Sequence, residues 1–295
     1  MEVVASKFSG FCNGVSASIS LLEREVETGG SVFLSSELVH NNLVSKKFLD
    51  QNVHYLNDIL DENGFVKAEN LVLAKESTLV IAAHGMPYLS FLKIKDSFRK
   101  IVDATCPIVQ KRECDIRSAL NEDKNEVILL VKNTSHSEVK TISDNLDKRI
   151  HFIKLGDDVA LLSTLDKRKT YDLHTQTTFP PCESEKYINY LKENGYNFEV
   201  KSRICPSCEE RQKDCANLAY LCSIIIVVGS SHSSNANELV NIAKKSGKEA
   251  YLVENIDELD KIPFKKGAVV GLISSASSSE KTFNAIKKKL EALPL

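Results

Sequence analysis

Three cysteines share one local pattern, in which each follows a strand-like segment and precedes a helix-like one. Cys12 lies in the motif GFCNGV, Cys106 in DATCP and Cys205 in CPSCEERQ, at intervals of 94 and 99 residues. A helix N-terminus favours the thiolate form of a nearby cysteine, and thiolates bind soft metals. The chain has eight cysteines and no recognisable secretory signal, which favours metal or redox use over a disulfide framework. We therefore expect the three cysteines to hold a metal centre.

Two kinds of metal centre fit three cysteines. A [4Fe–4S] cluster normally takes four, so three would leave one iron open for Lewis-acid chemistry on a substrate oxygen. Zinc bound by three cysteines and a histidine is the competing interpretation. A zinc ribbon is disfavoured, because the pair Cys205 and Cys208 has no second pair at the same spacing. Cys208, Cys215 and Cys222 recur every seven residues, which is typical of a buried helix face, although Cys208 would also lie near the metal centre.

Polar residues follow each of these cysteines at two nearly constant distances. The residues 28 or 30 positions further on are His40, His136 and Asn235. The residues 71 or 72 positions further on are His84, Thr177 and Ser277. Each ends a strand-like segment, and ligands of open α/β sheets bind at the carboxyl ends of the strands. The repeat thus predicts three units whose strand ends surround one central site.

The surrounding segments alternate between strand-like and helix-like patterns. Apolar runs of strand length cover residues 31–35, 78–83, 127–131, 151–155, 223–228, 249–253 and 268–273. Amphipathic segments cover residues 15–27, 108–120, 183–193, 211–221 and 237–245. This alternation predicts βαβ units and an α/β fold. We expect three α/β domains, formed by residues 13–103, by residues 104–202, and by residues 203–295 together with 1–12.

The composition is that of an ordinary globular protein, with 295 residues, 42% of them hydrophobic and 26% charged. The net charge of −2 gives no overall attraction to nucleic acid or to an anionic membrane, so local geometry must hold any anionic ligand. No apolar run approaches the ~20 residues of a membrane span. Together with the missing export signal, this predicts a cytoplasmic protein.

The motifs as a set resemble those of one family. In chain order they are GFCNGV, ELVHN, AAHG, DATCP, SHSEV, TQTT, the RQ of CPSCEERQ, VVGSSHSSNANEL and SASSSE. Almost end to end, the chain resembles the LytB/IspH family of 4-hydroxy-3-methylbut-2-enyl diphosphate reductases. The resemblance implies a trefoil of three α/β domains around a [4Fe–4S] cluster with one open iron, bound by Cys12, Cys106 and Cys205.

The resemblance also implies an activity. It is the reductive dehydroxylation of the allylic diphosphate to isopentenyl and dimethylallyl diphosphate, in the non-mevalonate isoprenoid pathway. A ferredoxin or flavodoxin would donate the electrons, since the chain has no G-x-G-x-x-G fingerprint for a flavin or nicotinamide.

The resemblance further implies roles for single residues. Glu138 matches the family's proton-delivering carboxylate, with Thr177 and His136 beside it. The substrate-binding residues carried over are His40, His84, His136, Gln176, Thr177, Ser233, Ser234, Asn235 and Ser277. Protonated histidines, neutral donors and helix N-terminal amides are the groups that can hold a diphosphate on a chain of this charge.

Some positions depart from the family pattern and keep other functions open. Ser137 replaces the usual Pro, Ser207 and Cys208 replace Ala and Thr, and Glu210 replaces Asn. A second hypothesis is therefore a LytB-like cluster enzyme with an altered cavity wall that acts on another small alcohol. A third is a non-catalytic iron–sulfur or zinc sensor, which would need neither Glu138 nor the TQTT loop.

Overall fold

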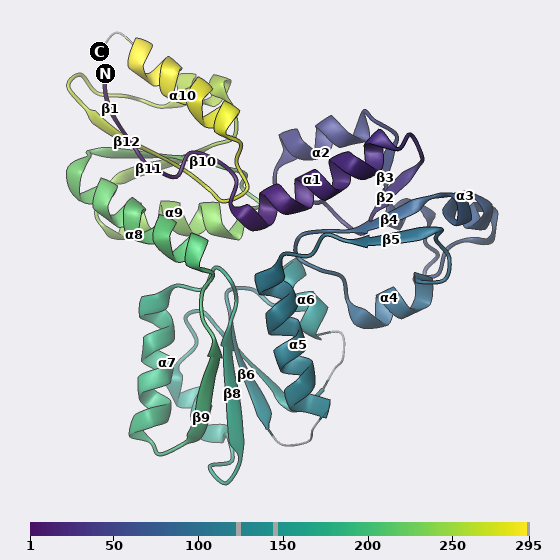
Figure 1. Cartoon of the computed structure of the whole chain (residues 1–295). Coiled ribbons are helices and arrows are strands. Elements are labelled where there is room, and N and C mark those ends of the chain that lie inside the picture. Colours follow the sequence, from purple (N-terminus) through teal and green to yellow (C-terminus); the bar gives the residue numbers. More distant parts are fainter. Residues whose placement is uncertain (122–124, 144–146, 294–295) are drawn as a thin grey trace. The chain divides into compact units, whose positions relative to one another are not determined.

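Three four-stranded sheets, with all strands parallel, form the framework of this computed structural model (Figure 1). The structure describes residues 1–121, 125–143 and 147–293. The predicted α/β class is confirmed. No helix in the described ranges is long and apolar enough to cross a membrane.

The chain clusters into two compact units. The first comprises Met1–Ser16, Val39–Lys46 and Pro206–Leu295, and the second Ala17–Leu38 and Lys47–Cys205. The division into three domains at residues 13–103, 104–202 and 203–295 with 1–12 stays a proposal.

The first unit contains one sheet, in the order β1-β12-β10-β11. Its strands are β1 (Glu2–Ala5), β10 (Ile224–Val228), β11 (Glu249–Val253) and β12 (Val269–Ser274). The helices of this part of the chain are α8 (Pro206–Leu221), α9 (Ser234–Lys245), the short 3₁₀ helix η4 (Ile256–Lys261) and α10 (Glu280–Ala292).

The second unit contains two sheets, in the orders β5-β4-β2-β3 and β9-β8-β6-β7. The strands of the first of these are β2 (Val32–Leu34), β3 (Val53–Tyr55), β4 (Thr78–Ile81) and β5 (Lys100–Asp103). Those of the second are β6 (Glu126–Val131), β7 (Ile150–Lys154), β8 (Thr170–Thr175) and β9 (Asn197–Ser202). The helices between residues 13 and 205 are α1 (Asn13–Glu27), α2 (Asn42–Leu49), η1 (Leu56–Ile59), η2 (Ala68–Asn70), α3 (Leu71–Glu76), α4 (Tyr88–Ile94), α5 (Pro107–Asn121), α6 (Ser137–Ser143), η3 (Val159–Thr164) and α7 (Pro181–Glu193). The starts of α1 and α2 belong to the first unit.

The three sheets repeat one strand order. In each sheet an edge strand, β1, β5 or β9, leads to one of the three cysteines. These edge strands pair with β12, β4 and β8, respectively. Each cysteine is followed at once by a helix, α1, α5 or α8. The repeat seen in the sequence is therefore a repeat of topology.

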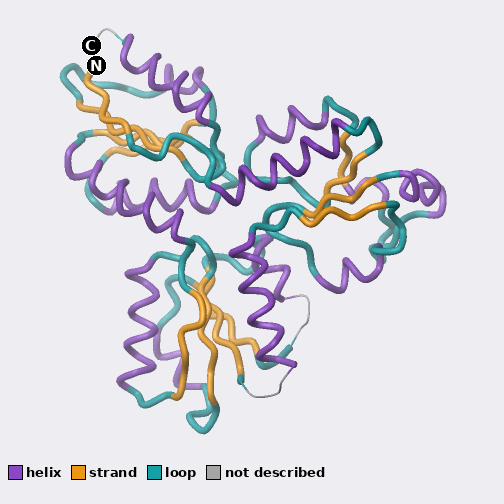
Figure 2. Tube along the Cα trace, viewed as in Figure 1, coloured by secondary structure: helices purple, strands orange, loops and turns teal. Residues whose placement is uncertain are grey.

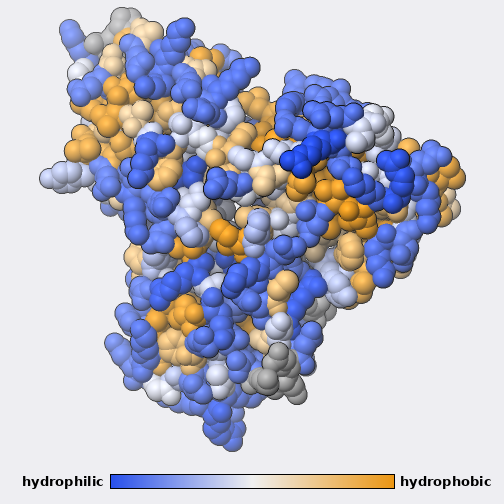
Figure 3. Space-filling view, in the orientation of Figure 1, coloured by the Kyte–Doolittle hydropathy of each residue, from blue (hydrophilic) through white to orange (hydrophobic). Residues whose placement is uncertain are grey.

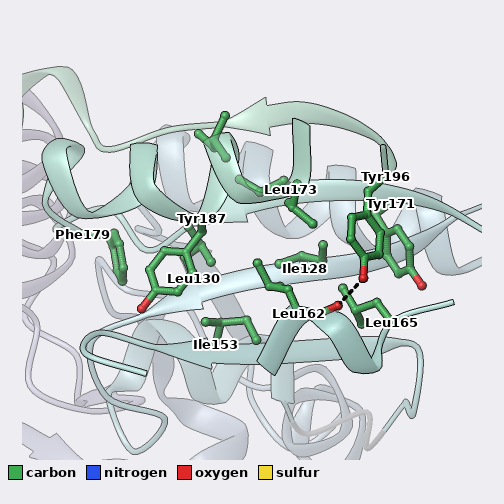
Figure 4. Packing of buried hydrophobic residues seen from close by; sticks show 12 residues of the cluster. Ile128, Leu130, Ile153, Leu162, Leu165, Tyr171, Leu173, Phe179, Tyr187 and Tyr196 are labelled. Carbon is green, nitrogen blue, oxygen red and sulfur yellow. Dashed lines mark hydrogen bonds between the residues drawn. The ribbon is translucent and has the colours of Figure 1, made fainter. Parts of the chain in front are cut away.

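The central strands are buried on both faces, as parallel sheets require. All residues of β4 and β10 are buried, as are five of the six in β6. In Figure 2 the strands of the β6–β9 sheet lie between helices on either side. Tyr171, Leu173, Phe179 and Tyr187 pack in the core on one side of that sheet (Figure 4). The face of the molecule in Figure 3 is mostly hydrophilic, with apolar residues exposed in separate areas.

The predicted helices are all present, but several begin earlier than predicted. The helix α8 begins at Pro206 rather than at residue 211, and α7 begins at Pro181 rather than at residue 183. Proline is favoured in the first turn of a helix because its missing N–H has no partner there in any case. The apolar periodicity starts only after these polar or proline-containing first turns.

We expect Leu173→Ala to lower the free energy of unfolding by about 2–5 kcal/mol, because the cavity lies in a packed core. Leu173 is fully buried in β8, whereas Leu161 in η3 is 48% exposed. The matched variant Leu161→Ala should stay within about 0.5 kcal/mol of the wild type in urea denaturation. Equal losses in the two variants would contradict this description of the core.

Candidate active site

Glu138 is buried at the start of α6 and held from two sides. It is only 3% exposed and lies in the first turn of the helix. Its carboxylate accepts hydrogen bonds from the backbone N of Thr177 (2.9 Å) and from Thr177 Oγ1 (2.6 Å), in the loop after β8. On its other side it forms an ion pair with Nη1 of Arg112 in α5, which is 2% exposed. A buried carboxylate is thus oriented towards a half-buried hydroxyl.

Gln176 directly precedes Thr177, and His136 lies two residues before Glu138. Each accepts a hydrogen bond from a backbone N–H. Gln176 Oε1 accepts a hydrogen bond from the backbone N of Lys132 (2.8 Å), and Nε2 has no hydrogen-bond partner among the described residues although it is buried. The backbone N of Glu138 approaches His136 Nδ1 at 3.3 Å, next to the N-terminus of α6. The unmatched amide of Gln176 is a donor available to a polar ligand.

One hydrogen-bond pattern links each of the three cysteines to a predicted ligand loop. The backbone N of Cys106 donates to the carbonyl of Ala83 (2.8 Å), directly before His84. Cys205 N donates to the carbonyl of Thr177 (2.9 Å). In the other unit, Cys12 N donates to the carbonyl of Ala276 (3.0 Å), directly before Ser277. Each cysteine therefore lies next to a residue predicted at the second of the two distances. Cys106 lies next to His84, Cys205 next to Thr177 and Cys12 next to Ser277.

His84 is 9% exposed, and its Nε2 lies 3.3 Å from Ser36 Oγ. The following residue, Gly85, has a φ of +85°, and a Cβ there would lie 3.2 Å from Thr141 Cγ2. Glycine therefore permits the turn directly after His84.

In the first unit, the loop after β12 lies beside the segment that carries His40. Ser277 Oγ donates to the carbonyl of His40 (3.2 Å), and Asn41 Nδ2 donates to the carbonyl of Ser277 (2.6 Å). The serines of this loop also bond one another, with Ser275 Oγ 2.9 Å from Ser278 Oγ. Two predicted ligands from distant parts of the sequence thus belong to one hydrogen-bonded cluster.

The N-terminus of α9 contributes the other predicted ligands of this unit. Ser233 caps the helix, because its Oγ accepts from the backbone N of Ala236 (3.2 Å), and Ser234 is the first helical residue. Asn235 is 5% exposed, and neither atom of its amide group has a hydrogen-bond partner in the described part of the chain. Unpaired buried amide atoms are costly, so a polar ligand at this helix N-terminus would complete them.

Arg211 is a structural residue of the site whose role the sequence analysis did not assign. It is 4% exposed, and its Nη2 donates to the carbonyl of Gly10 (2.7 Å) while Nη1 donates to Ser207 Oγ (2.5 Å). Its guanidinium also lies 5.1 Å from the centre of the Phe8 ring. In the sequence it is part of the RQ motif. Its hydrogen bond to Gly10 holds the loop that leads to Cys12.

The remaining cysteines divide by burial, and none of the eight forms a disulfide bond. Cys215 and Cys222 are core residues, and burial raises the pKa of the Cys215 thiol to about 12. Cys208 is 6% exposed, whereas Cys114 and Cys182 are exposed. Glu210, expected to alter the wall of the cavity, is also exposed to solvent.

The donor chemistry of the three predicted cysteines fits a soft metal centre. Each directly precedes a helix and donates its backbone N–H to a loop carbonyl in the same way. Within the described ranges, no three His, Cys, Asp or Glu side chains are close enough to hold a metal ion. The fit therefore rests on residue type and repeated position.

The fold and these motifs define a protein family. A family model described as LytB protein matches residues 3–291, and the chain belongs to this family. Membership implies an iron–sulfur enzyme.

Curated relatives carry the name 4-hydroxy-3-methylbut-2-enyl diphosphate reductase. The protein of Fusobacterium nucleatum is 31% identical over 303 residues, which cover 99% of this chain and 34% of that protein. The present chain thus spans about a third of that relative's length. The protein of Dictyoglomus thermophilum is 29% identical, with 96% of this chain and 94% of its own length covered.

A solved structure has the same fold. It is the structure of the E-1-hydroxy-2-methyl-but-2-enyl-4-diphosphate reductase from Plasmodium falciparum, with a TM-score of 0.85 and 24% identity. The match covers 99% of this chain and 89% of that one.

We expect Gly229→Ala to destabilise the first unit by about 1–3 kcal/mol through overpacking. A Cβ at Gly229, just after β10, would lie 2.8 Å from the Cβ of Ala236 in α9 and 2.9 Å from the Oγ of Ser275 in the loop after β12. The control Gly30→Ala meets no atom closer than 3.5 Å. Thermal unfolding should separate the two variants, and equal melting temperatures would show that α9 is not packed this tightly.

Proposed function

We propose that this protein is a 4-hydroxy-3-methylbut-2-enyl diphosphate reductase of isoprenoid biosynthesis. It removes the allylic hydroxyl group and forms isopentenyl and dimethylallyl diphosphate. The reaction breaks the C–O bond, takes up two electrons and two protons, and releases water. The observation that carries the proposal is the buried Glu138, which holds Thr177 Oγ1 while the Thr177 carbonyl accepts from Cys205 N. Thr177 thus contacts both the buried carboxyl group and the backbone of a candidate metal ligand.

We assign Cys12, Cys106 and Cys205 as the ligands of a [4Fe–4S] cluster with one open iron. Such a cluster, when bound, supplies electrons and a Lewis acid for the substrate's hydroxyl oxygen. Three cysteines at equivalent strand-to-helix junctions support the assignment. Zinc remains the alternative metal, and iron analysis decides between them.

Thr177 and Glu138 form the proton path of the proposal. Thr177 is half-buried and Glu138 is buried behind it, so the Thr177 hydroxyl is the group that reaches the substrate. Glu138 then exchanges protons with Thr177 Oγ1. His136, at the start of the same helix, is the third catalytic residue of the proposal.

The diphosphate is assigned to residues that offer neutral or cationic donors. They are His40, His84, His136, Gln176, Thr177, Ser233, Ser234, Asn235 and Ser277. The unpaired amide atoms of Asn235 and Gln176 support a polar ligand, and the N-terminus of the 12-residue helix α9 favours an anion. We further propose that a ferredoxin or flavodoxin donates the electrons and that the protein acts in the cytoplasm.

A second candidate function keeps the cluster and changes the substrate. Cys208, which stands where the family pattern has Thr, is buried in α8 and supports a modified pocket. A non-catalytic sensor is less well supported, because it gives no role to the buried contact between Glu138 and Thr177. Product analysis separates these functions.

We expect Cys106→Ser to lose most of the iron bound after anaerobic reconstitution, since an alcohol replaces a thiolate ligand. The matched variant Cys114→Ser changes an exposed thiol on the same helix and should bind as much iron as the wild type. Iron and sulfide content, with the visible spectrum, measure the outcome. Full iron content in Cys106→Ser would remove that residue from the ligand set.

We expect the reconstituted wild type, supplied with reduced methyl viologen, to convert the allylic diphosphate to both products. Glu138→Gln should lower kcat by about 10²–10⁴-fold, the usual contribution of general acid–base catalysis. Glu185→Gln, which breaks an exposed ion pair with Arg203, serves as the control and should keep full activity. Mass spectrometry of the products gives the rates. A cluster-loaded wild type that leaves the diphosphate intact would favour a different alcohol as substrate.

A further inference from the structure

A buried polar network continues behind Glu138, away from Thr177. Arg112 pairs with Glu138 through Nη1, and its Nε donates to Ser202 Oγ (3.2 Å) at the end of β9. Ser202 Oγ in turn lies 3.0 Å from Nδ1 of His174 in β8. No role for Arg112, Ser202 or His174 is predicted from the sequence.

Every residue of this network comes from the β6–β9 part of the second unit. Arg112 is 2% exposed and His174 is fully buried. Burial and the nearby charge of Arg112 lower the pKa of His174 to about 4, so this histidine is neutral at pH 7. Arg112 thus lies between a neutral imidazole, reached through Ser202, and the carboxyl group of Glu138.

Within the described ranges, Arg112 is a buried charge with one ion pair and one unsatisfied nitrogen. Its Nη2 has no hydrogen-bond partner among the described residues. Well-packed hydrophobic residues stabilise a core at least as well as a buried ion pair does, so such a pair is weak evidence of a stabilising role. The guanidinium is always protonated, which excludes Arg112 as a proton donor but suits it to hold a carboxylate in a fixed place.

The two carboxylate oxygens of Glu138 have different hydrogen-bond partners. Oε1 accepts from both Arg112 Nη1 and the Thr177 backbone N, while Oε2 accepts from the Thr177 hydroxyl. Oε1 is thereby fixed, and Oε2 is left to the hydroxyl. The carboxylate has one orientation for exchanging a proton with Thr177 Oγ1.

We propose that Arg112 is a positioning residue, whose guanidinium fixes Glu138 so that Oε2 faces the Thr177 hydroxyl. The inference rests on the proposed reductase function, in which these two groups carry protons to the departing oxygen. Arg112 acts through Glu138 and touches neither substrate nor metal.

The test compares Arg112→Gln, Arg112→Lys and Ser202→Ala with the wild type as reconstituted enzymes. Arg112→Gln should lower kcat about 10–100-fold with KM changed less than twofold, because the loss falls on proton transfer rather than on substrate binding. Arg112→Lys keeps the charge and should recover part of kcat. Ser202→Ala leaves the Arg112–Glu138 pair in place and should change kcat less than threefold.

A double variant separates positioning from a general structural effect. If Arg112 acts through Glu138, Arg112→Gln added to Glu138→Gln should reduce kcat no further. Multiplying losses would instead mean independent roles and would overturn the inference. Thermal unfolding of each variant identifies any that fails to fold, and Arg112→Lys then carries the comparison.

His174 gives a readout that needs neither cluster nor turnover. Its pKa, followed by NMR titration of the metal-free protein, should rise from about 4 in Arg112→Gln and stay low in Arg112→Lys. An unchanged pKa in Arg112→Gln would contradict the network. An active wild type with unaltered kcat in Arg112→Gln would overturn this inference alone. A cluster-loaded wild type without turnover would overturn the proposed function and the inference together.

Discussion

The backbone hydrogen bond made by each of the three cysteines is the contact on which the arrangement of the site depends. Cys106, Cys205 and Cys12 donate to Ala83, Thr177 and Ala276, respectively, in the loop that ends the neighbouring strand. Because the strands of each sheet are parallel, the edge strand and its neighbour end on the same side. The chain thereby places a thiol at a helix N-terminus directly beside a loop of polar residues. The threefold repetition of this arrangement supports the proposed role of these cysteines as metal ligands.

Within the second unit, the hydrogen bonds at the strand ends continue into a buried network of polar and charged side chains. Thr177 contacts Cys205 through its carbonyl and Glu138 through its hydroxyl and N–H. Glu138 in turn pairs with Arg112, which reaches Ser202 and so His174. Burying such groups is unfavourable unless they are hydrogen-bonded to one another, and this chain retains them beside its candidate site. The proposed proton transfer therefore explains these buried polar residues better than a contribution to the free energy of folding does.

Much of the fold could be predicted from the sequence, because short apolar runs such as 127–131 and 223–228 favour buried strands, and β6 and β10 are buried. The positions of the cysteines at strand-to-helix junctions were visible for the same reason. Helix starts such as Pro206 and Ser234 were missed, since first turns are polar and carry no apolar periodicity. Arg112 was missed because one arginine in an amphipathic helix looks like a solvated charge, and only tertiary structure shows that it faces a buried glutamate. The role of Arg211 likewise depends on Phe8 and Gly10, about 200 residues away in sequence.

We have proposed that Cys12, Cys106 and Cys205 hold a cluster whose fourth iron is open to an allylic diphosphate. Mössbauer spectroscopy of protein reconstituted anaerobically with isotopically enriched iron tests it most directly, with and without the diphosphate. We expect one iron site distinct from the other three, with parameters that change when the diphosphate is added. Four equivalent irons with thiolate ligands would contradict the claim and would point to Cys208 as a fourth ligand.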